Sequence, residues 1–244
     1  MSSPVSIARG GALMAAVLMA TLSGSTLPAG AATGATALYG EAMTTTRSWS
    51  VHYISSGSDS KVSMLTSGDA GPASGTQEVL VGQGTTADRA SLVVIGGITY
   101  MNGDARALID LTGLSALQAA ATAGKWIQFA TDNQVFSQVV AGVRSTDVAQ
   151  ELALKGPYRL GSPRRLDGYE VDPVLGTQHF PGLKTQRSVL YVRANGLHVP
   201  VEEDTLNAQG NPNGVEHTVF SHWGEMVRPL APQATATIGA VSTA

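Results

Sequence analysis

The sequence predicts an α+β domain in which a large curved antiparallel sheet of about ten strands carries an inserted block of short helices. Three observations predict this class. Short β-type segments separated by turn clusters fill residues 49–101, a helical period takes over from Asp104 to Lys155, and the β pattern returns after Pro157. With 244 residues, of which 43% are hydrophobic and 14% charged, the chain can bury a sizeable core. We expect one domain, over residues 32–229.

Residues 1–31 are expected to form a secretory signal peptide, cleaved near Ala31. Arg9 precedes an apolar run over residues 11–22, and small residues follow. The run is too short to cross a bilayer core of about 30 Å, so we expect an exported protein, extracellular or in the cell envelope, with no stable membrane anchor. Loss of Arg9 changes the formal charge from -3 to -4 (-3 - 1), which argues against nucleic acid as a partner.

The first half of the chain predicts antiparallel hairpins. The candidate strands are separated by clusters rich in glycine, serine and aspartate, and they span residues 49–55, 61–67, 76–82, 91–95 and 98–101. Their alternation marks one buried and one mixed face. Gly96-Gly97 predicts a two-residue hairpin loop, because glycine accepts the positive φ angles of primed turns.

The helical block begins with two short helices whose ends can be recognised. Asp104 can cap the first, which Gly113 ends, and Ser115 and Gln118 form a capping box for the second. Residues 125–130 then alternate like a strand.

Two more short helices are expected in the rest of the block. Asp132 can cap a helix with an apolar stripe at Val135, Phe136, Val139 and Val140. Ser145 or Thr146 can cap the last helix, which carries Val148 and Leu152, and Gly156-Pro157 is expected to stop it.

After Pro157 the β pattern returns. Asp167-Gly168 and Asn195-Gly196 are hairpin signals, and the last strand covers residues 215–223. Pro200 lies inside one segment, so that strand is expected to be an edge strand or to carry a bulge. Residues 230–244 lack charge and aromatic side chains, and we expect a disordered tail there.

We identify no catalytic residue, no metal site and no cofactor. No G-x-S-x-G pentapeptide is present, and Ser115 is explained as a helix cap. Cysteine is absent, which excludes a thiol nucleophile. His217 and His222 are five residues apart on a strand, so their imidazoles are expected on opposite faces and unable to share a metal ion.

Two further motifs have simpler explanations than ligand binding. The glycine-containing segment 82–87 resembles a dinucleotide fingerprint, but a strand follows it rather than a helix, so we interpret it as a hairpin loop. The pair Arg164-Arg165 could contact an anionic headgroup, but a solvated corner is the simpler interpretation.

Several candidate strands are apolar on both faces, and the expected helices can cover only part of a ten-strand sheet. A curved sheet with a partial helical plug encloses either a filled core or an apolar cavity. The residues leave both alternatives open.

The runs 91–108, 111–129 and 188–204 resemble actinobacterial exported proteins of the LolA-like superfamily, which includes the LppX and LprG lipoproteins. This resemblance covers residues 38–229 and implies a half-barrel of about 10–11 strands around a helical plug, enclosing a hydrophobic cavity for acyl chains. The lipoprotein members carry a lipidated cysteine at the mature N-terminus, which this chain lacks.

If the helical block is the plug, helix and strand faces suggest apolar wall residues, namely Leu108, Leu111, Leu114, Trp126, Phe129, Phe136 and Val140. The leading hypothesis is an exported binding or carrier protein for a lipid or other lipophilic molecule, and not an enzyme. The alternative is an interaction or structural module of the cell envelope with a filled core and a possible protein partner. A hydrolase with an unrecognised site is the third hypothesis.

Overall fold

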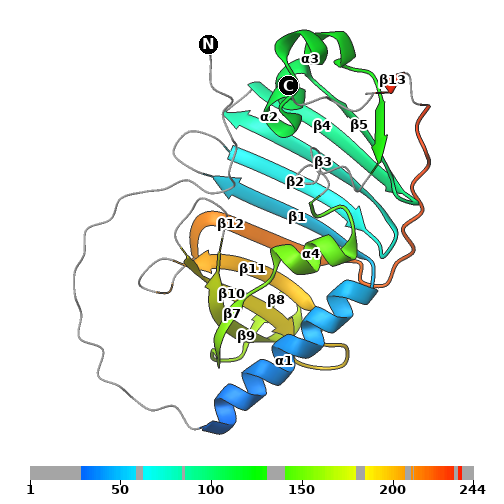
Figure 1. The fold of residues 1–244 in the computed structure, drawn as a ribbon. Helices are drawn as coiled ribbons and strands as arrows, with labels where there is room; N and C mark the ends of the chain where they lie inside the picture. The colour runs from blue at the N-terminus through cyan, green and yellow to red at the C-terminus, as the bar shows by residue number, and fades with distance from the viewer. Residues whose placement is uncertain are drawn as a thin grey trace, which may run out of the picture.

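One sheet of 13 strands forms the framework of the computed structural model (Figure 1). The structure describes residues 29–58, 63–83, 86–130, 141–179, 185–206, 210, 212–233 and 236–237. The strands lie in the order β13-β6-β5-β4-β3-β2-β1-β12-β11-β10-β9-β7, and β8 pairs with β9 off this path. The long strands pair antiparallel, and β13 is parallel to β6. The predicted α+β class with a large antiparallel sheet is confirmed.

The first half of the chain forms the expected series of hairpins. Its strands are β1 (Val51–Ser58), β2 (Ser63–Ala70), β3 (Ser74–Gln83), β4 (Thr86–Ile95) and β5 (Ile98–Gly103). Gly96 and Gly97, with φ angles of 56° and 85°, form the β4–β5 loop. β3 and β4 pair antiparallel up to Gln83 and Thr86, which confirms that segment 82–87 belongs to a hairpin, while residues 84–85 lie outside the described residues.

The second half of the chain extends the same sheet from the other side of β1. Its strands are β7 (Lys155–Leu160), β8 (Arg164–Leu166), β9 (Tyr169–Gln178), β10 (Gln186–Arg193), β11 (Pro200–Leu206) and β12 (Pro212–Ser221). Asp167 and Gly168 have φ angles of 47° and 86° in the β8–β9 turn. The register between β10 and β11 shifts next to the pair Val192–Pro200. Of the two expected alternatives, an edge strand or a bulge, the bulge is confirmed. The pair Arg164-Arg165 is exposed, as the interpretation as a solvated site requires, but it lies in the short strand β8 rather than in the turn that follows.

The first two predicted helices are confirmed, together with the capping box of the second. α2 (Ala105–Thr112) is followed by Gly113 at a φ of 70°, and α3 (Ala116–Thr122) has the capping box of Ser115 and Gln118. Asp104 is at the N-cap of α2, but its carboxylate accepts a hydrogen bond from the backbone N–H of Arg89 instead of a helix N–H. The strand expected next is β6 (Ile127–Ala130). The helix expected after Asp132 lies outside the described residues.

The last predicted helix is present, but both of its predicted boundaries are wrong. α4 (Ser145–Glu151) has Arg144 at its N-cap, where the guanidinium and the backbone N–H both donate to the Asp147 carboxylate. Gly156-Pro157 does not stop the helix, because it lies inside β7. The helix ends earlier, at Glu151, since Leu152 to Leu154 turn the chain into the sheet.

The longest helix, α1 (Ala29–Ser48), was not expected from the sequence. Glycine and threonine are weak helix formers, and the segment is rich in both. The hydroxyls of Thr44, Thr45 and Thr46 each donate to the carbonyl four residues earlier, so they bond within the helix. Among the described residues, no helix has both the length and the apolarity that a membrane crossing requires.

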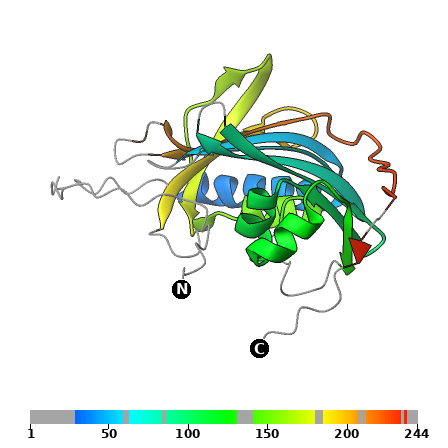
Figure 2. The same ribbon diagram turned by 90° about the horizontal axis from the view of Figure 1, so that it is seen from above.

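The four helices of the described residues lie on one side of the sheet, which arches over them (Figure 2). We call this side the concave face and the other the convex face. The helices pack in two pairs, α1 with α4 and α2 with α3. Each pair covers its own apolar cluster, one that includes Leu92, Met101 and Leu108 under α2 and α3, and one that includes Met43 and Leu190 under α1 and α4. The helical cover is therefore divided over one continuous sheet.

Two backbone contacts place the chain where it enters α4. Gly71 forms a β-bridge with Arg144, and Gly75 lies directly against the carbonyl of Val143. Near the other end of the chain, Ala236–Thr237 forms β13 beside β6, so these two residues depart from the expected disordered tail.

Candidate functional site

The predicted wall residues gather mainly on one side of the concave face. Four of the seven lie in or against the apolar cluster under α2 and α3, namely Leu108, Leu111, Leu114 and Phe129. Trp126, just before β6, is half-buried, and Phe136 and Val140 lie outside the described residues. The structure thus brings four of these side chains together, and their contact with a ligand stays a prediction.

A small pocket lies between α4 and the centre of the sheet. Its volume is about 20 Å³, which is room for roughly one water molecule. The helix contributes Val148 and Leu152 to its walls, while the sheet contributes polar side chains, among them Glu203 and Thr218. The centre of the concave face is therefore polar, whereas the clusters on either side of it are apolar.

The polar side chains form one row across four neighbouring strands. Thr66 on β2 pairs with Ser55 on β1, Ser55 pairs with Thr218 on β12, and Thr218 pairs with Glu203 on β11. In the middle of the row, the Thr218 hydroxyl donates to Ser55 Oγ at 3.0 Å. At its two ends, Thr66 Oγ1 and Glu203 Oε1 are buried without a hydrogen-bond partner. Such orphaned polar atoms are costly, so a missing polar partner is indicated here.

Burial raises the pKa of the Glu203 carboxyl well above its usual range, because the charged form loses its water. The negative charges of Glu216 and Asp204 raise that pKa further, and a hydrogen bond with Ser188 opposes the shift. The charge of Glu151 on α4 also raises it. An uncharged Glu203 can donate a hydrogen bond as well as accept one.

Larger hollows open on the outside of the fold. One of about 580 Å³ runs along α1 beside residues 196–198, and one of about 310 Å³ lies at the ends of β1, β2 and β3. Both are more open than the pocket under α4, so neither encloses a ligand as a cavity does.

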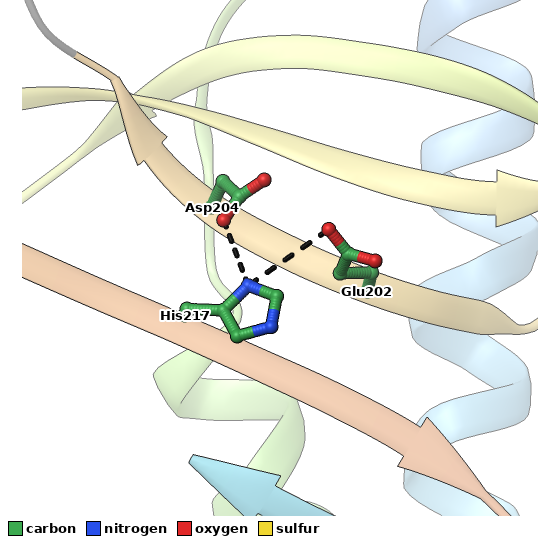
Figure 3. A group of neighbouring side chains, drawn as sticks. All are labelled: Glu202, Asp204 and His217. Atoms are coloured by element: carbon green, nitrogen blue, oxygen red, sulfur yellow. Dashed lines mark hydrogen bonds and ion pairs between the residues drawn. The ribbon is translucent and has the colours of Figure 1, made fainter. Parts of the chain in front are cut away.

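A second group of polar side chains lies on the convex face (Figure 3). Glu202 and Asp204 alternate with Glu203 along β11, so they point away from the helices. The Nδ1 atom of His217 on β12 lies 2.8 Å from Asp204 Oδ1 and 3.8 Å from Glu202 Oε1. The Glu202 pKa is raised, first by burial and then by the Asp204 charge.

The sequence matches no protein-family model, and no curated protein sequence matches it. Solved structures do match along most of its length. LprF from Mycobacterium bovis is 14% identical, with 82% of this chain and 97% of LprF covered at a TM-score of 0.49. An uncharacterised conserved protein from Thermus thermophilus is 9% identical, with 84% and 98% covered at a TM-score of 0.44.

A LolA superfamily protein is also among the matches. This protein, from Nitrosomonas europaea, is 12% identical, with 80% of this chain and 94% of that protein covered at a TM-score of 0.30.

The three side chains on the convex face were missed in the sequence because they come from two strands. The histidine pair was considered there, and His222 does not share a site with His217, because it follows β12 at a φ of 55° and lies beside His52. The acidic partners of His217 are Glu202 and Asp204. The alternation of these two acids was a visible signal, but the register Asp204 to His217 was needed to connect them.

Proposed function

We propose that this chain is an exported, non-catalytic binding or carrier protein for a lipophilic molecule with a polar group. Its apolar part would lie against the clusters on the concave face, and its polar group would reach the row from Thr66 to Glu203. The observation that carries the proposal is the pair of buried, unpartnered atoms at the ends of that row, Thr66 Oγ1 and Glu203 Oε1. Either atom can form a hydrogen bond with a ligand hydroxyl, amide or carboxyl group.

The divided helical cover supports this function. The pocket under α4 holds only about 20 Å³, so an acyl chain needs the two helix pairs to move apart. Each pair packs on its own apolar cluster, so one pair can move without disturbing the packing under the other. Burying an acyl chain gains about 0.8 kcal/mol per CH₂ group and requires no catalytic residue.

A titration with cis-parinaric acid, a naturally fluorescent fatty acid, tests the proposal. Leu111 is a half-buried wall residue on α2, and Leu117 on α3 is 83% exposed. We expect Leu111→Gln to weaken binding about fivefold, because about 1 kcal/mol of apolar contact is lost. The matched Leu117→Gln should bind as the parent does. Equal binding by both variants and the parent would place the probe outside the concave face.

A second function, a protein-binding module with a filled core, is favoured by the small volume under α4. Ligand pockets usually measure about 300–1,000 Å³. The titration with cis-parinaric acid distinguishes the two functions. A protein with a filled core should not bind this fatty acid at any concentration below that at which the fatty acid itself aggregates.

A further inference from the structure

We propose that Glu202, Asp204 and His217 bind one divalent transition-metal ion on the convex face of the sheet. A ligand atom from each of the three lies within 4.8 Å of those from the other two. Figure 3 shows the two carboxylates of β11 directed at the same ring nitrogen, Nδ1 of His217 on the neighbouring strand β12. This is the arrangement in which an ion can replace the proton between the imidazole and the acids.

The sheet itself fixes these three positions. Asp204 pairs with His217 across β11 and β12, and Glu202 is two residues along the same face of β11. The Asp204 and Glu202 side chains are 6% and 16% exposed, so little side-chain freedom remains to be lost on binding. The His217 side chain is 41% exposed, which leaves a path for the ion and for water ligands.

The donor set indicates the class of ion. One imidazole nitrogen and two carboxylate oxygens suit borderline metals such as Zn²⁺, Co²⁺ or Mn²⁺, with water at the open positions. Calcium prefers six to eight oxygen ligands, and this group offers two carboxylates and a nitrogen. The usual order of affinities places Zn²⁺ above Mn²⁺, so Zn²⁺ is the probe of choice.

A second histidine–aspartate pair shows what an ordinary ion pair on this sheet looks like. His52 Nδ1 lies 2.8 Å from Asp69 Oδ1, the same distance as between His217 and Asp204. Asp69 is 54% exposed, and no third ligand atom converges there among the described residues. His52 is paired with one carboxylate, whereas His217 faces the carboxylates of both Asp204 and Glu202. The Arg164 guanidinium supplies one positive charge that acts on Glu202. A bound cation would balance the second carboxylate of this largely buried pair.

Isothermal titration calorimetry with ZnCl₂ tests this site in the full, tag-free chain after removal of metals with EDTA. We expect one Zn²⁺ per chain, no comparable heat with CaCl₂, and at least a tenfold rise in Kd for His217→Ala and Glu202→Gln. The matched control His52→Ala should bind as the parent does. Glu202→Gln keeps the shape of the side chain, so a loss of affinity without a change in thermal unfolding isolates the ligand role.

Absence of Zn²⁺ binding to the parent would overturn the proposal. Retention of full affinity by both His217→Ala and Glu202→Gln would do the same, as would a loss confined to His52→Ala. These outcomes are independent of fatty-acid binding, since the helices and the concave face lie on the other side of the sheet.

Discussion

Gly75 on β3 lies so close to Val143 that a Cβ atom on Gly75 would stand 1.9 Å from the Val143 carbonyl oxygen. This contact holds the chain that leads into α4 against the middle of the concave face. It fixes where the chain enters α4, so the position of this helix over the sheet depends on it.

Gly75→Ala should therefore destabilise the protein by roughly 2 kcal/mol or more, because the backbone must move to remove the clash. Gly40→Ala is the matched control. Gly40 is in the interior of α1 with nothing near its Cβ position, and there alanine should stabilise by about 0.5–1 kcal/mol. Urea denaturation measures both. Equal effects of the two changes would mean that the Gly75–Val143 contact is absent in solution.

Glu203→Gln tests the polar row through pH. Because the Glu203 pKa is raised in the folded state, the folded chain keeps a proton that the unfolded chain releases above pH of about 4.3. The protonated Glu203 carboxyl thus contributes fully to the free energy of unfolding below that pH. This contribution is lost as the pH rises through the pKa that Glu203 has in the folded state. Glutamine has no such proton, so the free energy of unfolding of the variant should fall less between pH 5 and 8.

The control for this measurement is Glu78→Gln, which changes an exposed glutamate on β3. Its pH profile should run parallel to that of the parent, with EDTA present throughout. A Glu203→Gln profile that also runs parallel to the parent would show that this carboxyl is solvated or paired in solution.

Movement of the helical cover can be measured with spin labels, because the chain has no native cysteine. Labels at Ala120→Cys on α3 and Gln150→Cys on α4 report on the distance between the two helix pairs, and both positions are exposed. Oleic acid should lengthen this distance by several ångströms. A pair at Thr44→Cys and Gln150→Cys, within one helix pair, should keep its distance. An unchanged α3–α4 distance in the presence of bound fatty acid would exclude parting of the cover.

Much of the fold was predictable because local chemistry determines it. Gly113, the capping box of Ser115 and Gln118, and the turn at Asp167-Gly168 act through neighbouring residues, and the sequence shows them directly. The end of α4 was not predictable in this way, since Gly156-Pro157 resembles a helix stop but lies in a strand. Glycine and proline residues show where a helix cannot continue, but the helix can end several residues earlier, as α4 does.

The parts that were missed depend on packing between distant segments. α1 has poor helix formers, and it is stabilised by burying Ala42 and Met43 against α4 and the sheet. The polar row and the group at His217 depend on which residues of β1, β11 and β12 lie opposite one another. Those registers are irregular near the bulge that follows Asp204, and the sequence contains no local signal for them.

Native mass spectrometry of delipidated protein, incubated with a lipid extract of bacterial envelopes, tests the central proposal most directly. We expect a lipid adduct at one molecule per chain that decreases in Leu111→Gln and persists in Leu117→Gln. Repeated absence of any adduct on a folded chain, or an adduct equally abundant in both variants, would contradict a lipophilic ligand on the concave face.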